Sequence, residues 1–198
     1  MSTRCGSLLH AGSLRPTLVR PHGYRMATHA GEDVVSSALQ QTGRWETESI
    51  ATLGVDNATD ARAGTFIDIG ANLGYFSFLF AHHGYRVFAV EPLQSNRRAI
   101  EATLCLNPRF ALSDRFTLIP TPVGPPALCK MVSNFRNRGN GRLTCEAPGG
   151  RPAFRPCATR RPSDAPLCEN MSTALLDSVL SVVPRDTPRP IVVKIDLV

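Results

Sequence analysis

Two acidic residues and a glycine loop stand where they could bind a nucleoside-containing ligand. A short apolar run, Thr65 to Ile69, leads into the loop Gly70-Ala-Asn72-Leu-Gly74, and a second run, Arg86 to Val90, ends at Glu91. The carboxyl ends of parallel strands meet at one edge of a sheet, so the loop and Glu91 are expected to face the same crevice. A ligand there would place its ribose hydroxyls on Glu91 and its charged end over the loop.

The residue types of the loop indicate which cofactor this would be. Dinucleotide-binding folds use Gly-x-Gly-x-x-Gly, in which the helix amino terminus faces a pyrophosphate. In Asp68-Ile-Gly70-Ala-Asn72-Leu-Gly74 the middle glycine is missing. An acid at the strand end, Asp68, repels a pyrophosphate but suits a cationic amino-acid group. S-adenosylmethionine carries such a group, a sulfonium and a ribose, and is therefore favoured over a nicotinamide dinucleotide.

The segments around the loop predict the α/β framework that positions it. Residues 75–83 are apolar and long enough for a helix, which gives the order strand, loop, helix, strand. Further helices are expected at 94–106 and 172–183 and within 32–53, where apolar residues follow a helical period. Residues 115–120 are predicted to form a third strand, outside the second because such crossovers are right-handed.

A fourth strand is predicted at the end of the chain. Ile191-Val-Val-Lys-Ile-Asp196 is nearly all apolar and β-branched, as in a buried parallel strand. It would lie beside the first strand and give the sheet order 3-2-1-4. Asp196 would then face Gly70 across the crevice.

The string DIGANLGYF at 68–76, followed by VEP at 90–92, resembles the first motifs of class I S-adenosylmethionine-dependent methyltransferases, and more narrowly the FkbM-type family. The resemblance covers roughly residues 44–198. It implies a Rossmann-like fold and O-methylation of a hydroxyl on a carbohydrate or small metabolite. It also implies that S-adenosylmethionine is bound by Asp68, Gly70, Asn72, Gly74 and Glu91.

The chain departs from the family after Asp196. The family continues K-I-D-x-E-G, whereas this chain reads Lys194-Ile-Asp196-Leu-Val198. The resemblance therefore implies a methyltransferase domain that is incomplete at its C-terminus. Positioning dominates methyl transfer, so Asp196 is the one candidate to orient or deprotonate the acceptor. The alternatives are a non-catalytic cofactor-binding or interaction fragment and, less favoured, an NAD-dependent oxidoreductase.

Length and composition indicate the number of domains, the absence of a predicted membrane-spanning helix and the expected location. The chain has 198 residues, 42% of them hydrophobic, which suits one domain with a core, and it has no apolar run long enough to span a membrane as a helix. Residues 1–31 contain four arginines and no acidic residue. They are predicted to be a disordered or targeting segment, followed by a single domain at 32–198. This composition fits a mitochondrial or chloroplast transit peptide; otherwise a cytoplasmic location is expected.

Residues 120–170 are predicted to be a proline- and arginine-rich loop. They hold nine of the sixteen prolines, which restrict the backbone and remove hydrogen-bond donors. The basic residues favour a solvated loop, with contact to an acidic glycan acceptor as the alternative. Too few aromatic residues are interleaved for nucleic-acid stacking, and no nucleic-acid partner is expected. The sequence does not indicate an oligomeric state.

Four of the six cysteines lie in this segment, at positions 129, 145, 157 and 168. Their spacing lacks the paired C-x-x-C of a zinc site, so no metal is expected. Reduced thiols are the first expectation. In an oxidising compartment disulfides would form instead, and Asn57-Ala-Thr59 and Asn170-Met-Ser172 would then be potential glycan sites.

Overall fold

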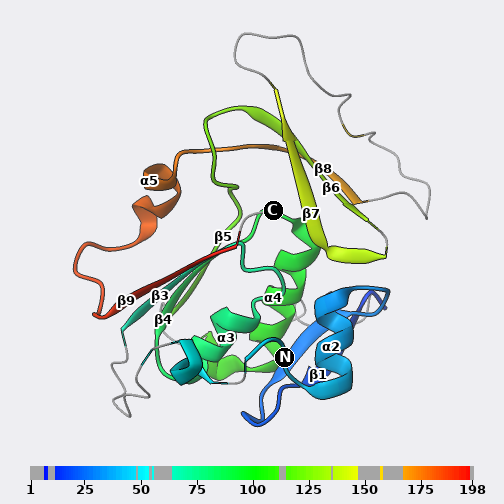
Figure 1. Ribbon diagram of the computed structural model, residues 1–198, viewed down its shortest axis with the longest axis vertical. Helices are drawn as coiled ribbons and strands as arrows, with labels where there is room; N and C mark the ends of the chain where they lie inside the picture. The colour runs from blue at the N-terminus through cyan, green and yellow to red at the C-terminus, as the bar shows by residue number, and fades with distance from the viewer. Residues whose placement is uncertain are drawn as a thin grey trace.

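A four-stranded parallel sheet forms the centre of the computed structural model (Figure 1). The structure describes residues 7–8, 12–47, 49–53, 55, 64–111, 115–134, 136–146, 157 and 167–196. The sheet consists of β3 (Thr65–Ile69), β4 (Arg86–Val90), β5 (Phe116–Ile119) and β9 (Ile191–Ile195), in the order β5-β4-β3-β9. The prediction of an α/β architecture around a parallel sheet is confirmed, and the arrangement is compatible with a Rossmann-like fold.

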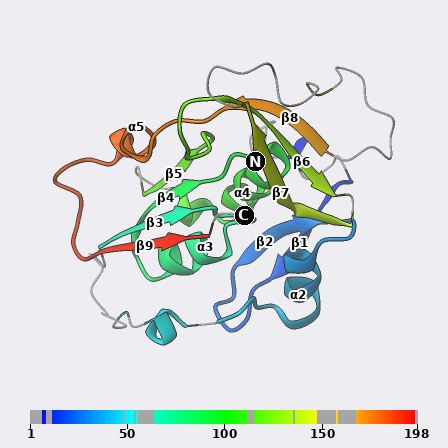
Figure 2. The ribbon, with the colours of Figure 1, turned by 45° about the horizontal axis from the view of Figure 1, so that its top comes forward.

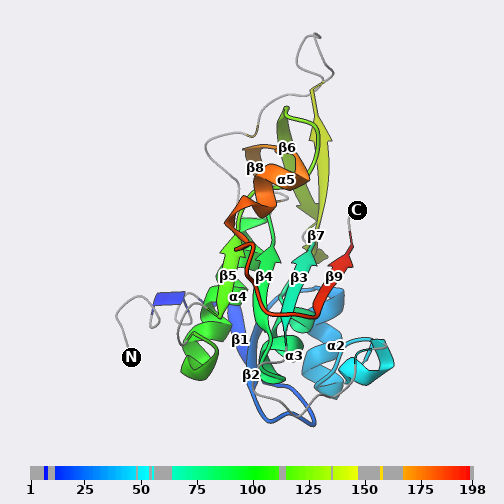
Figure 3. The same ribbon diagram turned by 90° about the vertical axis from the view of Figure 1, so that its left-hand side faces the viewer.

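The register of the sheet brings three chain segments to one edge. Ile69 lies opposite Val90 on one side and Ile195 on the other, so β3, β4 and β9 end at the same level. The residues that follow them are Gly70, Glu91 and Asp196. Figure 3 shows all four strands pointing the same way, toward a second, antiparallel sheet.

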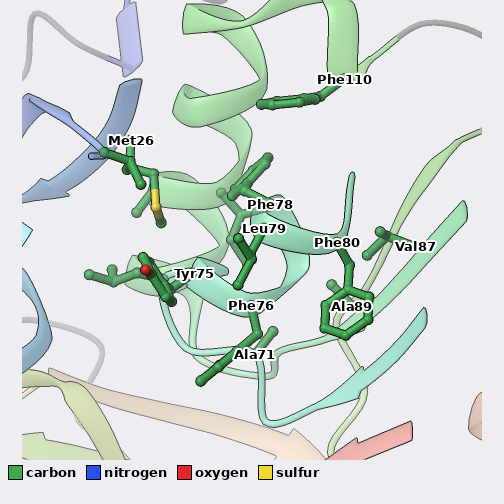
Figure 4. Close-up of a cluster of buried hydrophobic side chains, with 14 of the residues drawn as sticks. Met26, Ala71, Tyr75, Phe76, Phe78, Leu79, Phe80, Val87, Ala89 and Phe110 are labelled. Atoms are coloured by element: carbon green, nitrogen blue, oxygen red, sulfur yellow. The ribbon is translucent and has the colours of Figure 1, made fainter. Parts of the chain in front are cut away.

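Helices α3 (Tyr75–His82) and α4 (Gln94–Leu106) cover one face of the parallel sheet. The side chains of α3 are almost all buried, and the ring of Phe80 stacks on that of Phe66 in β3 at a centroid distance of 3.8 Å. Figure 4 shows these α3 side chains between Met26 on one side and Val87 and Ala89 of β4 on the other. The short 3-10 helix η2 (Pro108–Phe110) follows α4 and adds Phe110 to this core.

An N-terminal hairpin packs against the outer side of α4. Strands β1 (Leu14–Leu18) and β2 (Arg25–His29) pair antiparallel, and the Ala27 N–H donates to Thr103 Oγ1 of α4 at 2.9 Å. The prediction of a disordered segment at 1–31 is therefore wrong for residues 12–31. The prediction failed because β1, with the sequence LRPTL, contains a proline and is mostly exposed, so it shows no alternating apolar pattern. Residues 1–6 and 9–11 lie outside the described part.

The helix expected within 32–53 is divided in two. Helix α2 (Val34–Thr42) begins at the cap Asp33 and ends at Gly43, whose φ of 77° is left-handed. A 3-10 helix, η1 (Ile50–Leu53), follows after an irregular turn. Glycine at this position accounts for the early end of α2.

The prediction of a loop at 120–170 is wrong for much of that segment. Strands β6 (Leu128–Asn134), β7 (Asn137–Cys145) and β8 (Leu167–Ser172) form an antiparallel sheet in the order β7-β6-β8. The burial of β6 alternates, with Cys129, Met131 and Ser133 turned inward. The described prolines of the segment precede β6 rather than interrupt it, so they do not prevent pairing.

Disulfide bonds join this sheet, so the expectation of reduced cysteines is wrong. Cys129 and Cys145 are opposite each other on β6 and β7 and are bonded, and Cys157 is bonded to Cys168 of β8. Cys105 is also disulfide-bonded, and none of the cysteines in the described ranges is free. The disulfide between paired strands stabilises a sheet in a segment whose composition favours a loop.

The other face of the parallel sheet is covered by α5 (Leu176–Val179) and η3 (Leu180–Val182), which pack on an apolar layer formed by Ile67, Ile69, Phe88, Val90 and Ile119. The helix expected at 172–183 is shorter because Ser172 belongs to β8. In the part of the chain that the structure describes, no helix has both the length and the apolar character needed to cross a lipid bilayer.

Candidate functional site

Figure 2 shows the parallel strands directed toward the antiparallel sheet. A cleft is lined by residues from the carboxyl ends of these strands and from the antiparallel sheet. The cleft is open to solvent, and its cavity volume is about 150 Å³, below the roughly 300–1,000 Å³ of typical small-molecule sites. It is lined by Ile69, Gly70, Asn72, Val90, Glu91, Pro92, Pro122, Val123, Met131, Gly139, Asn140, Gly141, Leu143 and Asp196. Four of the six predicted site residues therefore meet here, namely Gly70, Asn72, Glu91 and Asp196.

The glycine loop is held in place by hydrogen bonds from its backbone N–H groups, most of them to the end of β4 and to Glu91. The N–H groups of Gly70 and Ala71 both donate to Val90 O at 3.0 Å, and the Gly74 N–H donates to Ala71 O at 2.8 Å. The Asn72 N–H donates to Glu91 Oε2 at 2.7 Å. Four of the five loop N–H groups are thus bonded within the chain, which removes the donors that a phosphate-binding loop would offer.

Gly70 is required by the close approach of the last strand. Its φ is +81°, and a Cβ placed on it would lie 1.9 Å from the backbone oxygen of Asp196. The Asp196 N–H in turn donates to Ile69 O at 2.9 Å. A side chain at position 70 would therefore displace the end of β9, so this glycine maintains the shape of the cleft floor.

Glu91 is buried, and each of its two carboxylate oxygens accepts a hydrogen bond from a backbone N–H group. It is 5% exposed, and its second carboxylate oxygen, Oε1, accepts from Leu93 N–H at 2.8 Å. Burial raises the pKa of Glu91 to about 7, while the hydrogen bonds from Leu93 and Asn72 act in the opposite direction. Each oxygen keeps a lone pair, so the carboxylate at the cleft wall can still accept from a ligand.

Asn72 presents an acceptor without a partner. Its backbone has a positive φ of 54°, and its Oδ1 is buried yet makes no hydrogen bond in the described part of the structure. The nearest wall is Gly139 of β7, where a Cβ would come within 2.7 Å of this oxygen. A buried, unpaired acceptor is costly, so a donor group of a ligand would relieve it.

Asp68 does not lie in the cleft. The side chain is fully buried on the α3 side of β3, where its Oδ2 accepts from Ser77 Oγ at 2.7 Å. Lys194 Nζ lies 3.5 Å from its other carboxylate oxygen. Burial raises the pKa of Asp68, opposed by the charge of Lys194 and by the bond from Ser77. Gly74 also lies apart from the cleft, packed against Phe78 and Ile100.

Asp196 lies at the open side of the cleft. Its side chain is 64% exposed, and Lys194 Nζ lies 3.4 Å from its Oδ2. Lys194 therefore stands between the carboxylates of Asp68 and Asp196, and also over the ring of Phe76 at 5.3 Å. One cation offsets part of the negative charge at this end of β9.

The antiparallel sheet supplies the lining residues that sequence reasoning missed. The backbone of Gly139 is fixed from both sides, since its N–H donates to Asp33 Oδ1 at 2.8 Å and its carbonyl accepts from Asn96 Nδ2 at 3.0 Å. Asn96 Oδ1 also lies 3.1 Å from His29 Nε2 of the hairpin. The sequence signal for this wall is the pair of closely spaced glycines 139 and 141, which fall within the segment predicted to be a loop.

Comparisons of the chain with models of protein families and with curated proteins, and of its structure with solved structures, found no match.

Proposed function

We propose that the chain is an S-adenosylmethionine-dependent methyltransferase that O-methylates a hydroxyl group of a carbohydrate or small metabolite. The observation that carries this proposal is the chemistry of the cleft wall, which offers acceptors rather than donors. Glu91, Asp196 and Asn72, whose Oδ1 is buried without a hydrogen bond in the described part, all line it. Four of the five loop N–H groups are already bonded. Such a wall suits a cationic ligand with hydroxyl groups and repels a pyrophosphate.

The residues present fit S-adenosylmethionine. The Glu91 carboxylate would accept hydrogen bonds from the ribose hydroxyls, and Asn72 Oδ1 would accept one from the ammonium group. Apolar lining for an adenine ring is available at Val90, Val123 and Met131. The strand order β5-β4-β3-β9 supports the class I methyltransferase fold, which places the cofactor at this edge.

When bound, the sulfonium of this cofactor supplies an electrophilic methyl group. The part left to the protein is to position the acceptor in line with that group and exclude water. Asp196, exposed at the cleft mouth, would orient the acceptor hydroxyl and take up its proton. Lys194 would hold the Asp196 side chain by its charge.

Isothermal calorimetry with S-adenosylhomocysteine and NAD tests the proposal. We expect binding of S-adenosylhomocysteine and none of NAD. Glu91→Ala should weaken binding by roughly ten- to a hundredfold, because a hydrogen bond to a charged group contributes about 1.5–3 kcal/mol. Glu32→Ala removes an exposed carboxylate outside the cleft and should leave the affinity unchanged. Binding of NAD alone, or equal affinity in Glu91→Ala with the fold intact, would contradict the proposal.

A further inference from the structure

Strand β8 presents an N-glycosylation triplet, Asn170-Met171-Ser172, on the outer face of the antiparallel sheet. Asn170 lies opposite Lys130 of β6, and Met171 lies opposite the inward-facing Cys129. Side chains alternate along a strand, so Asn170 and Ser172 share the face that points away from the cleft. Both residues are exposed.

The hydrogen bonding of Asn170 leaves its reactive atom available. Its carbonyl oxygen Oδ1 accepts from the Cys157 N–H at 3.0 Å. The amide nitrogen Nδ2, the atom that takes a glycan, makes no hydrogen bond to the described residues. The existing bond therefore fixes the side chain while a sugar on Nδ2 remains compatible with the fold.

The cysteines indicate the compartment in which this triplet would be used. All five cysteines in the described ranges are disulfide-bonded, one of these bonds joining Cys157 to Cys168 beside Asn170. Disulfides persist in oxidising compartments, and the lumen where secreted proteins form them is also where Asn-x-Ser/Thr is glycosylated. Oxidation and glycosylation of this sheet belong to the same environment.

We propose that Asn170 is the acceptor of an N-linked glycan when the chain folds in an oxidising secretory lumen. The donor is an oligosaccharide carried on a lipid pyrophosphate. The Asn170 amide nitrogen attacks the anomeric carbon and a C–N bond forms. The C–O bond to the pyrophosphate breaks, the pyrophosphate leaves with the bonding electrons, and the nitrogen loses one proton. This proposal is independent of the proposed methyltransferase function.

The position of the glycan has two consequences. It projects from the face opposite Met131 and the cleft lining, so cofactor binding is unaffected. It also covers β8, which is an edge strand of the sheet. A bulky, solvated group there prevents pairing of this edge with another chain.

The test expresses the full chain in cultured animal cells behind a cleavable signal peptide. The secreted chain is treated with a peptide N-glycosidase in heavy-oxygen water, and the peptide containing residue 170 is analysed by mass spectrometry. We expect Asn170 to be converted to heavy-labelled Asp in most copies. The label should fall to background in Ser172→Ala and persist in Ser172→Thr, which keeps the hydroxyl. Asn57→Gln, at the other triplet, should leave it unchanged.

A secreted, disulfide-bonded chain with an unmodified Asn170 would overturn the proposal. If a variant fails to be secreted, the same peptide is examined after translation into isolated microsomes, in chains protected from added protease. Absence of sugar on Asn170 in these translocated chains overturns the proposal equally. Calorimetry on the glycosylated and the enzymatically deglycosylated chain should give the same affinity for S-adenosylhomocysteine. A difference in affinity would contradict the placement of the glycan on the face that points away from the cleft.

Discussion

The ionisation of Glu91 should control ligand affinity near neutral pH. Burial raises its pKa to about 7, so about a tenth of the population is ionised at pH 6 and about nine tenths at pH 8. The ionised carboxylate is the better acceptor for ribose hydroxyls, and affinity therefore rises with pH. We expect binding of S-adenosylhomocysteine to strengthen by up to about tenfold between pH 6 and 8, as measured by calorimetry.

Glu91→Gln is the matched control, because the amide keeps the size of the side chain and does not ionise. Its affinity should be weaker and nearly independent of pH over the same interval. If the unmodified chain shows a flat profile as well, then Glu91 is not an acceptor for the ligand.

For single residues, the sequence predicted where each site residue lies along its strand better than which side of the sheet its side chain faces. Gly70, Glu91 and Asp196 are each the first residue after a parallel strand, and the register brings them to one edge as expected. Asp68 lies within β3, where alternate side chains face opposite sides, and it shares the buried face of Phe66. The contacts that hold it there, from Ser77 and Lys194, depend on tertiary packing that no local pattern contains.

At the scale of elements, local signals explain what could be predicted. The bounds of β3, β4 and α4 match the expected segments because glycine, proline and apolar period coincide at their ends. The pairing of β6 with β8 was missed because it spans a long, proline-rich interval. Pairing at that separation depends on side-chain packing and disulfides, which composition does not reveal.

The disulfide between Cys129 and Cys145 should hold β7 over the cleft. It joins opposite residues of β6 and β7 and closes a segment with a sequence separation of 16. A loop of about this length corresponds to about 3 kcal/mol of stabilisation. We expect Cys129→Ala/Cys145→Ala to lower the free energy of unfolding by about that amount in chemical denaturation. It should also weaken ligand binding, because β7 supplies Gly139 and Gly141 to the cleft.

The matched variant is Cys157→Ala/Cys168→Ala, which removes the other disulfide of the sheet but leaves β6 joined to β7. It should lower stability while preserving most of the affinity. Equal loss of binding in the two double variants would show that β7 is not held by its own disulfide.

For the whole molecule, the two faces of the parallel sheet are unequally covered. Helices α3 and α4 with the hairpin cover one face across β3 and β4, and Val192 of β9 packs into that core. On the other face, α5 and η3 cover β3, β4 and β5. The side chains of β9 on this face remain exposed, with Ile191 at 41%, Val193 at 50% and Ile195 at 62%.

An apolar edge strand of this kind should promote association between copies of the chain. In the described structure β9 pairs with β3 alone, so its outer backbone groups and three apolar side chains are available to another strand. We expect the mean mass measured by sedimentation to rise with concentration. Val193→Lys places a charge on this exposed face and should suppress the rise, with a change in unfolding free energy within about 0.5 kcal/mol. Val192→Lys, one residue earlier, places its charge at a half-buried position against the opposite core and should instead destabilise the fold. A chain that stays monomeric at all concentrations, or a Val193→Lys variant that associates like its parent, would show that this edge is already protected.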